Sequence, residues 1–272
     1  MVLYFYLLVF VLGLCCGSFI NMLVYRTAVE YELIKSKGIK KNEEKGFLRS
    51  LNGRSFCDNC GQQLHWYENV PVMSWVLQQG KSKCCRKKLS VLYPIVEMMM
   101  GILFLVHFSV GAGNTPLLLV VEFIIIVFLV FSAVFDLKYM ILPDFSTVIL
   151  VILAVVVVVI GRPQESPLQF VLSAVGSFGF LGLLYLITKG KGMGFGDVKL
   201  AIFMGLFLGP EKVLLAFYTA FVIGALVSLG LMILKKANKK TLISFGPFLI
   251  LGTLVAWFYG DQLWNFWFYF MK

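Results

Sequence analysis

The most informative stretch of the sequence is Gly190-Lys191-Gly192-Met193-Gly194-Phe195-Gly196-Asp197, which stands directly before an apolar run. Glycine at every second position allows the backbone to approach other groups closely. The stretch ends in a carboxylate at the edge of an apolar segment, where an acid is costly unless it is paired or used. Asp136 occupies a matching place at the end of another apolar run. Two acids placed in this way predict an aspartyl protease that works inside a membrane.

The composition is typical of a membrane protein. Of the 272 residues, 60 % are hydrophobic and 14 % are charged, whereas about a quarter of the residues of a soluble domain are charged. The net charge of +10 would suit a nucleic-acid partner, but membrane proteins concentrate Lys and Arg in their cytoplasmic loops. The sequence therefore predicts an all-α, polytopic integral membrane protein that contacts the lipid bilayer and no nucleic acid.

Apolar runs predict eight membrane-spanning helices. They lie at residues 2–24, 91–110, 117–135, 145–161, 168–188, 198–208, 213–234 and 242–260. Most approach the ~20 residues that cross the hydrocarbon core as a helix. The run 198–208 is too short to cross alone, because a helix rises only ~1.5 Å per residue. We therefore expect the glycine-rich stretch before it to enter the membrane as irregular chain and to carry Asp197 with it.

The basic residues predict the orientation of these helices. If the N-terminus lies outside, 21 of the 24 Lys and Arg residues fall on the cytoplasmic side. This asymmetry is typical of multi-pass proteins of the cell membrane and accounts for the positive net charge. The same threading brings Asp136 and Asp197 to the cytoplasmic ends of two helices, so we expect the active site to face the cytoplasm.

A polar segment at residues 26–90 holds four of the six cysteines, as Cys57-x-x-Cys60 and the adjacent pair Cys84-Cys85. The segment is too short to build a large core without help. Four thiols in a cytosolic segment favour a metal over disulfides, and we expect all four to bind a structural zinc. The second pair is irregular, since adjacent cysteines seldom occupy one tetrahedral site.

The paired acids supply a mechanism for peptide hydrolysis. One ionised carboxylate takes a proton from water, and a second, protonated one polarises the scissile carbonyl. Like charges at close range enforce that division, and the two groups titrate together. A glycine-rich pocket leaves room for an extended substrate backbone.

Other interpretations of these residues stay open. Asp136 taken alone is as well explained as an interfacial or capping residue. Asp144 follows Pro143, and an acid in the first turn of a helix offsets the helix dipole. Glu97 lies about two turns into the second span, where it pairs with a basic residue, lines the cavity or makes a local hydrogen bond. A phosphate-binding loop is disfavoured, because the glycine stretch follows no strand and lacks the Lys-Ser/Thr ending.

Together these residues resemble the type IV prepilin peptidases, the membrane aspartyl proteases that mature pilins and the pseudopilins of type II secretion and competence. The resemblance runs through most of the chain in the family's order. It rests on five stretches: Gly17-Ser18-Phe19-Ile20-Asn21 to Arg26, Cys57-x-x-Cys60, Leu89-Ser90-x-x-Tyr93-Pro94-x-x-Glu97, Asp136 to Leu142-Pro143-Asp144, and Gly194-x-Gly196-Asp197-Val198-Lys199-Leu200.

The resemblance implies a role for each matching residue. Asp136 and Asp197 would be the catalytic pair. The active-site loop would contain Gly194 and Gly196, and the supporting residues would be Glu97, Asp144 and Lys199. The substrate would be a prepilin or pseudopilin whose short basic leader is cut on the cytoplasmic side, after a glycine, at the cell membrane of a prokaryote.

Many members of this family also methylate the new N-terminus with S-adenosylmethionine, so the resemblance implies that cofactor as well. The cysteine segment departs from the family pattern. Aligned back from Leu89-Ser90, the second cysteine pair of the family falls at Ser82 and Cys85. Ser82 thus replaces one cysteine, and Cys84 would become the fourth ligand only through a rearranged loop.

The sequence therefore predicts three parts: a first transmembrane helix at residues 1–25, a cytoplasmic cysteine-containing domain at 26–90, and a membrane aspartyl protease domain at 91–272. Two alternatives stay open, of which the first belongs to another functional class. One is a non-enzymatic transporter whose paired acids relay protons. The other is a different presenilin-like intramembrane protease, because Gly-x-Gly-Asp also occurs in that group.

Overall fold

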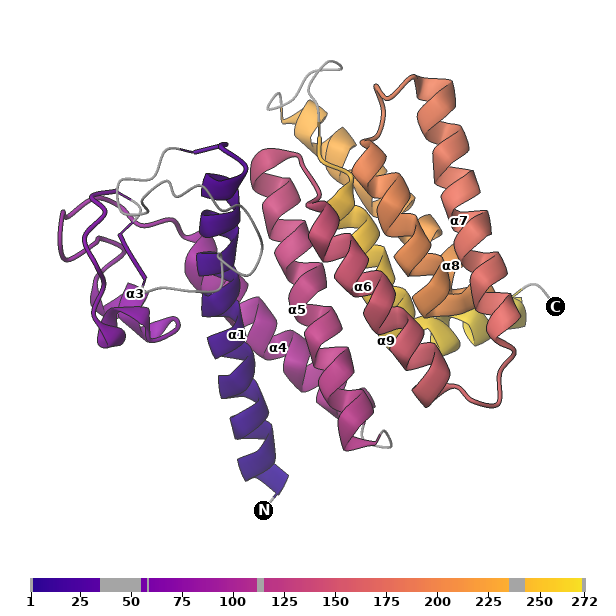
Figure 1. Ribbon diagram of the computed structural model, residues 1–272, viewed down its shortest axis with the longest axis horizontal. Helices are drawn as coiled ribbons and strands as arrows, with labels where there is room; N and C mark the ends of the chain where they lie inside the picture. The colour runs from indigo at the N-terminus through magenta and orange to yellow at the C-terminus, as the bar shows by residue number, and fades with distance from the viewer. Residues whose placement is uncertain (1, 35–54, 58, 112–114, 235–242, 271–272) are drawn as a thin grey trace. The chain divides into compact units, whose positions relative to one another are not determined.

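The computed structural model describes residues 2–34, 55–57, 59–111, 115–234 and 243–270. Over these residues the regular structure is helical, as expected, with two isolated β-bridges and no strand. The elements are α1 (Val2–Glu30), η1 (Trp66–Asn69), α3 (Met73–Leu77), α4 (Leu92–Val110), α5 (Pro116–Tyr139), α6 (Asp144–Val156), η2 (Val157–Gly161), α7 (Pro167–Thr188), α8 (Phe195–Ile233) and α9 (Gly246–Phe270) (Figure 1). They form two compact units, residues 1–112 and 113–272.

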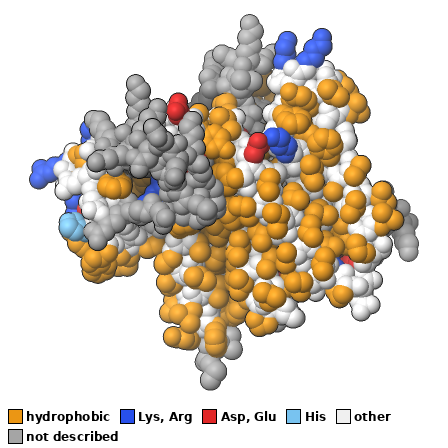
Figure 2. All heavy atoms as spheres, viewed as in Figure 1, with side chains coloured by type: hydrophobic (Ala, Val, Ile, Leu, Met, Phe, Trp, Pro, Cys, Tyr) orange, Lys and Arg blue, Asp and Glu red, His pale blue; other side chains and the backbone are white. Residues whose placement is uncertain are grey.

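Six of the described helical segments are long and apolar enough to cross a membrane. They are Leu3–Glu30, Leu92–Val110, Pro116–Tyr139, Asp144–Gly161, Pro167–Thr188 and Phe195–Ile233. Figure 2 shows hydrophobic side chains over most of the visible helical surface, as expected where lipid surrounds the protein. The chain is therefore a polytopic membrane protein.

The last of these segments, α8, is broken at one point. Its backbone leaves the helical region at Gly209, with φ 78° and ψ 179°, directly before Pro210. Glycine tolerates this positive φ, and proline cannot continue the hydrogen-bond pattern of the preceding turn. The predicted spans 198–208 and 213–234 lie one on each arm of α8, and the kink at Gly209 lies between them. The last predicted span, 242–260, overlaps α9.

The start of α8 differs from the expectation. We expected irregular chain up to Asp197, but the helix begins at Phe195 with Gly194 as its N-cap, so Gly196 and Asp197 lie in its first turn. The reason is local: the Gly194 N–H donates to the Asp197 carboxylate at 3.1 Å. An acid at this position also offsets the positive end of the helix dipole.

The N-terminal unit is built on close packing of α1 against α4. A side-chain carbon at Gly13 would lie 2.7 Å from the Gly101 Cα, and one at Gly17 would lie 2.5 Å from the Glu97 Cα. Both contacts are closer than carbon atoms allow, so glycine is required at both positions. Gly13 and Gly17 form a G-x-x-x-G pattern, which brings membrane helices into backbone contact. The helix continues to Glu30, beyond the predicted end at residue 25.

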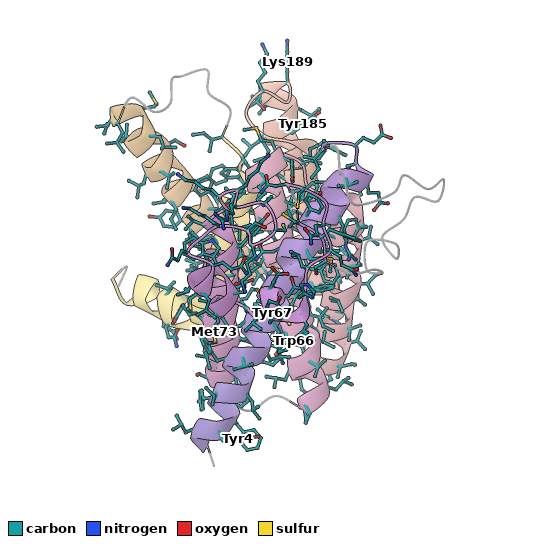
Figure 3. All side chains as sticks on the ribbon, turned by 90° about the vertical axis from the view of Figure 1, so that its left-hand side faces the viewer. Tyr4, Trp66, Tyr67, Met73, Tyr185 and Lys189 are labelled. Carbon is teal, nitrogen blue, oxygen red and sulfur yellow. The ribbon has the colours of Figure 1, made fainter. Side chains whose placement is uncertain are left out.

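The C-terminal unit is organised around α8, which packs against α6, α7 and α9, while α5 packs against α6 and α9. Its core contains fully buried phenylalanines, among them Phe131, Phe135, Phe203 and Phe207. The chain turns sharply after α7, where Lys189 and Gly190 both have positive φ. Figure 3 shows Lys189 beyond Tyr185 at this end of the helix. This turn leads into α8 and so fixes the position of Asp197 in the first turn of that helix.

Candidate functional site

Asp136 and Asp197 lie in the C-terminal unit, on two different helices. Asp136 belongs to the last turn of α5, and its side chain is 6 % exposed. Asp197 belongs to the first turn of α8 and is 4 % exposed. Most carboxylates lie on protein surfaces, because burial removes the water that stabilises their charge. Two buried acids at helix ends in one compact unit are therefore the first candidates for chemistry.

The two carboxylates meet at Gly246, the first residue of α9. A side-chain carbon at this glycine would lie 3.2 Å from the Asp136 Cγ and 3.3 Å from the Asp197 Oδ1. It would come closer still to the Asp136 Oδ2. Both acids therefore border the position that a side chain at residue 246 would occupy, and they approach the start of α9 this closely only because residue 246 is glycine.

Each carboxylate has a hydrogen-bond donor of its own. The Ser244 hydroxyl donates to the Asp136 Oδ2, and the Gly246 backbone is a further partner of this carboxylate. The Gly194 N–H donates to the Asp197 Oδ2. Hydrogen bonds of this kind hold carboxylate oxygens at fixed positions. Because two like charges at close range repel each other, the pair is suited to sharing one proton.

The other residues expected at the site lie around it or elsewhere. Lys199 forms an ion pair with Asp144, with 2.7 Å between Nζ and Oδ1, and the two side chains are 36 % and 69 % exposed. A side-chain carbon at Gly196 would lie 2.9 Å from the Leu142 Cβ, so this glycine allows α8 to approach the segment before α6. Glu97 lies in the N-terminal unit, on α4.

Ser244 and Gly246 were not identified from the sequence. Both follow a basic segment, Ser244 lies just before α9 and Gly246 begins it, and Ser244 is 108 positions away from Asp136 in the sequence. Neither apolar periodicity nor charge reports a contact between residues so far apart. The available signal was Ser244-Phe245-Gly246-Pro247, a short turn-forming stretch at the start of an apolar run.

The four cysteines of the polar segment come together in the N-terminal unit. The sulfur atoms of Cys57, Cys60, Cys84 and Cys85 all lie within 4.8 Å of one another. The Cys60–Cys84 distance is 3.1 Å, and the Cys57–Cys85 distance is 3.8 Å. Zinc–sulfur bonds of about 2.3 Å in a tetrahedron place sulfurs about 3.8 Å apart. The cluster therefore has the composition and dimensions of a tetrahedral metal site.

Two short hairpins build this cluster. In the first, Phe56 pairs with Gln63, and the Gly61 N–H donates to the Cys57 carbonyl at 2.8 Å. In the second, Lys81 pairs with Lys88, and the Arg86 N–H donates to the Ser82 carbonyl at 2.8 Å. Each hairpin presents two cysteines at its turn, and the tight second turn brings Cys84 into the cluster together with its neighbour Cys85.

Ser82 supports the cluster without being a ligand. Its hydroxyl lies 3.4 Å from the Cys57 sulfur and 3.0 Å from the Cys84 sulfur. Burial alone would raise the pKa of the Cys57 thiol, but hydrogen bonds from Ser82 and from the backbone of Cys60 and Asn59 outweigh burial and lower this pKa to about 6. A thiol that ionises readily is a good metal ligand, because the thiolate is the coordinating form.

Two family models and several curated proteins match this chain. Residues 11–110 match the family model of the bacterial peptidase A24 N-terminal domain, and residues 123–229 match that of the type IV leader peptidase family. Three curated relatives are named prepilin leader peptidase/N-methyltransferase. They are those of Aeromonas salmonicida strain A449 (29 % identical over 275 residues, 95 % of this chain and 92 % of the relative), Pseudomonas putida (30 % over 275 residues, 96 % and 92 %) and Bacillus subtilis strain 168 (29 % over 222 residues, 80 % and 87 %). No solved structure matches the chain.

Proposed function

Because the chain belongs to the type IV leader peptidase family, we propose that it is a membrane-embedded aspartyl endopeptidase that removes the short basic leader of prepilins or pseudopilins. One observation carries the assignment of the catalytic pair: Asp136 and Asp197 are both buried and approach the same backbone position at Gly246. The match to a peptidase family favours hydrolysis over a proton relay as the use of this pair.

The mechanism follows from the two carboxylates. One of them, ionised, takes a proton from a water molecule, and the oxygen of this water attacks the scissile carbonyl carbon. The other, protonated, donates its proton to the carbonyl oxygen, so that the tetrahedral intermediate carries no full negative charge. Ser244 and Gly194 hold one oxygen of each carboxylate. At Gly246 the Asp136 Oδ2, which Ser244 holds, faces the Asp197 Oδ1, which is free to exchange protons with water and substrate.

Gly246 allows the two carboxylates to approach each other. Because residue 246 has no Cβ, both acids come close to the same backbone position at the start of α9, where they can act on one substrate bond. The supporting roles that we propose are smaller: Gly194 orients Asp197 through its N–H, Gly196 allows α8 to approach Leu142, and the exposed pair Lys199–Asp144 ties the start of α8 to α6.

The topology proposed for the chain has its N-terminus outside and its active site facing the cytoplasm of a prokaryotic cell. The distribution of Lys and Arg supports it, because membrane proteins retain basic residues on the cytoplasmic side. Residues 26–90 then form the cytoplasmic cysteine-containing domain, between the first transmembrane helix at 1–25 and the membrane protease domain at 91–272.

The metal proposed for the cysteine cluster is zinc. Cys57, Cys60, Cys84 and Cys85 would hold it, and their four sulfurs fit a closed structural site that leaves no position for substrate. The bound ion would cross-link the two hairpins of a segment that is too small to build a large core of its own.

The second proposed activity is N-methylation of the new N-terminus, with S-adenosylmethionine as the methyl donor. The names of the relatives support it, since the three relatives above are each named as an N-methyltransferase as well as a peptidase. Residues 11–110, which match the bacterial peptidase A24 N-terminal domain and lie outside the match to the type IV leader peptidase model, are the part of the chain that we assign to this activity.

Cleavage by the purified protein tests the proposed peptidase. The wild-type protein is reconstituted in lipid vesicles with a candidate prepilin, and the products are weighed. We expect a single cut at the junction of the basic leader and the hydrophobic helix. A cut inside the hydrophobic helix would indicate a different intramembrane protease. No cut with any of several prepilins, together with proton-coupled uptake by the same vesicles, would indicate a transporter.

A further inference from the structure

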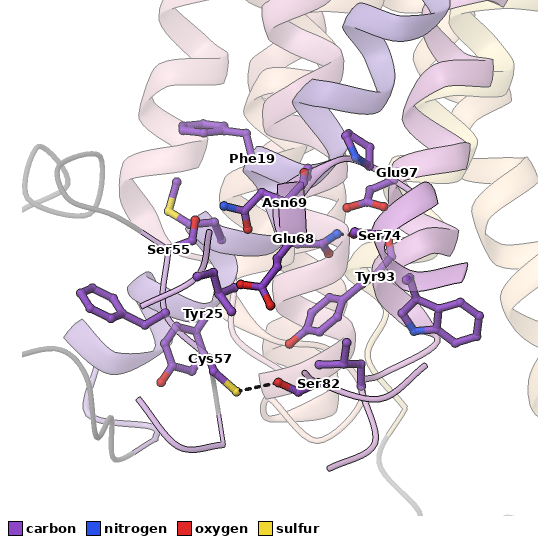
Figure 4. Close-up of a pocket in the computed structure, with 18 of the residues that line it drawn as sticks. Phe19, Tyr25, Ser55, Cys57, Glu68, Asn69, Ser74, Ser82, Tyr93 and Glu97 are labelled. Carbon is purple, nitrogen blue, oxygen red and sulfur yellow. Dashed lines mark hydrogen bonds between the residues drawn. The ribbon is translucent and has the colours of Figure 1, made fainter. Parts of the chain in front are cut away.

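The N-terminal unit contains a cavity of about 390 Å³. Its wall is formed by α1, the two hairpins, η1, α3 and the start of α4. Figure 4 shows Cys57 and Ser82 at one end of this cavity and Glu97 toward the other, with Glu68 and Tyr93 between them. Sites for small molecules usually have volumes of about 300–1,000 Å³. The cavity is therefore large enough for a ligand the size of a nucleoside joined to an amino acid.

Glu97 is the buried acid of this cavity. Its side chain is 6 % exposed, and its Oε2 accepts a hydrogen bond from the Val72 N–H at 2.7 Å. Its other hydrogen-bond partners, Ser18 and Asn21, are neutral, and among the residues that the structure describes no Lys or Arg forms an ion pair with it. A buried carboxylate without a cationic partner is costly. A positively charged ligand would remove that cost.

The backbone that holds Glu97 is strained. Val72 has φ 60° and ψ −51°, and the Met73 N–H donates to the Pro71 carbonyl across it. This is a γ-turn with positive φ at its centre, a rare conformation that is especially unfavourable for a β-branched residue. Strained backbone persists only where the surrounding structure holds it in place, and such residues are concentrated at functional sites. Here the turn aims the Val72 N–H at the carboxylate and fixes its position in the cavity wall.

Two further polar atoms in the wall lack partners. The Asn21 side chain is 9 % exposed, and its Nδ2 donates to the Tyr93 carbonyl at 3.1 Å, but its Oδ1 accepts no hydrogen bond from any described residue. The Trp75 Nε1 likewise donates to none of the described residues. Buried polar groups are nearly always hydrogen-bonded. Both residues line the cavity, so a ligand that carries both kinds of group would pair with these atoms once their side chains turn toward it.

We propose that this cavity binds S-adenosylmethionine and that Glu97 pairs with its cationic end. S-adenosylmethionine carries a sulfonium and an ammonium, and these cations suit Glu97 and Glu68. It also carries a carboxylate, which suits Arg26 in the same wall. Its adenine offers donors and acceptors for Asn21 and Trp75 and a flat face for aromatic side chains. The inference rests on the methyl-transfer part of the proposed function.

The chemistry that the bound donor supplies is transfer of one methyl group. The amine nitrogen of the substrate forms a bond to the methyl carbon, the bond from sulfur to that carbon breaks with its electron pair going to sulfur, and the amine loses one proton to water. The α-amine of the cleaved substrate is also an organic cation when protonated, so it is the rival occupant for Glu97.

Binding to the purified protein tests the proposal without relying on activity. Equilibrium binding of radiolabelled S-adenosylmethionine is measured for the wild type and for Glu97→Gln, which keeps an oxygen acceptor for the Val72 N–H but removes the charge. We expect the Kd to rise at least tenfold. The matched control is Glu32→Gln, since Glu32 lies in the same unit outside the cavity wall, and its Kd should stay within twofold of the wild-type value.

A second pair of variants tests the unpaired N–H group of Trp75. Trp75→Phe keeps an aromatic ring and removes Nε1, and we expect it to raise the Kd threefold or more. Trp66→Phe is its control, because Trp66 is 81 % exposed and does not line the cavity. These variants keep the proposal falsifiable if Glu97→Gln does not yield folded protein.

Three outcomes would overturn the proposal. The first is that wild-type protein cleaves prepilin but shows no saturable binding of S-adenosylmethionine, and the second is an unchanged Kd in both Glu97→Gln and Trp75→Phe. The third is that S-adenosylmethionine does not bind, whereas a short peptide with a free N-terminal amine binds in a way that needs Glu97. The last outcome would assign the cavity to the product amine. Wild-type protein that binds the donor but cleaves no prepilin would contradict the proposed peptidase and leave this inference standing.

Discussion

Replacing Gly246 by alanine tests whether the close approach of both carboxylates to this residue is needed for cleavage. The added methyl group would lie 3.2 Å from the Asp136 Cγ and 3.3 Å from the Asp197 Oδ1, whereas ordinary contact begins at 3.4 Å. The Asp136 Oδ2 lies nearer still and has to move away. Gly246 does not have a positive φ, so alanine is compatible with the backbone and its effect comes from the methyl group alone.

The size of the effect follows from this geometry. A displacement of about 1 Å at a reacting group costs on the order of 10²-fold in rate, which corresponds to about 2.7 kcal/mol of transition-state stabilisation. We expect kcat for prepilin cleavage to fall by about this factor with a smaller change in KM, because the acids act on bonds rather than on distant parts of the substrate.

The assay compares kcat and KM of purified wild type, Gly246→Ala and Gly176→Ala. Gly176 is a matched control, because it lies on α7 with no atom within 4 Å of its added carbon. The control should cleave like wild type. Folded Gly246→Ala protein with a kcat within threefold of the wild-type value would refute the idea that both acids work across this glycine.

Four further changes have expected outcomes. Ser244→Ala removes a hydrogen bond to a carboxylate, worth about 1.5–3 kcal/mol, so kcat should fall about 10- to 100-fold; an unchanged kcat would remove Ser244 from the site. Asp144→Asn breaks an exposed ion pair worth at most about 1 kcal/mol, so kcat/KM should fall less than about fivefold, and abolished cleavage would make Asp144 a rival catalytic acid. Cys57→Ser should lose bound zinc by elemental analysis while Cys16→Ser retains it; zinc absent from wild type, or kept by Cys57→Ser, would disprove the metal site. Gly17→Ala pushes α1 away from α4 and should lower the free energy of unfolding by about 1–3 kcal/mol, so Tm should fall; an unchanged Tm would contradict the close packing of α1 against α4.

The sequence predicted the features that depend on composition and local pattern. Apolar runs identified the helices, and the acids at the ends of two runs identified Asp136 and Asp197 as candidates that the structure places in the same unit. The predicted cysteine set also came together, although the Cys84-Cys85 pair is irregular. Adjacent cysteines reach one cluster here because a tight hairpin turn at Arg86, with φ 54°, carries them both.

The features that the sequence did not predict depend on contacts between distant segments. Ser244 reaches Asp136 only after α5 and the start of α9 are packed together, and no periodic pattern encodes that contact. The short run 198–208 suggested irregular chain before Asp197, but a helix can start earlier when an acid caps its own N-terminus, as Asp197 does through Gly194. The wall around Glu97 likewise depends on the strained turn at Val72.

The most direct test of the catalytic pair is prepilin cleavage by Asp136→Asn and Asp197→Asn, each compared with wild type and Asp144→Asn at matched amounts of folded protein. Asparagine keeps the shape of the side chain but neither takes up nor releases a proton at neutral pH. If the two carboxylates share the proton transfers, each of the first two variants loses cleavage and Asp144→Asn retains it. Cleavage at the wild-type rate by either Asp136→Asn or Asp197→Asn would contradict the pair.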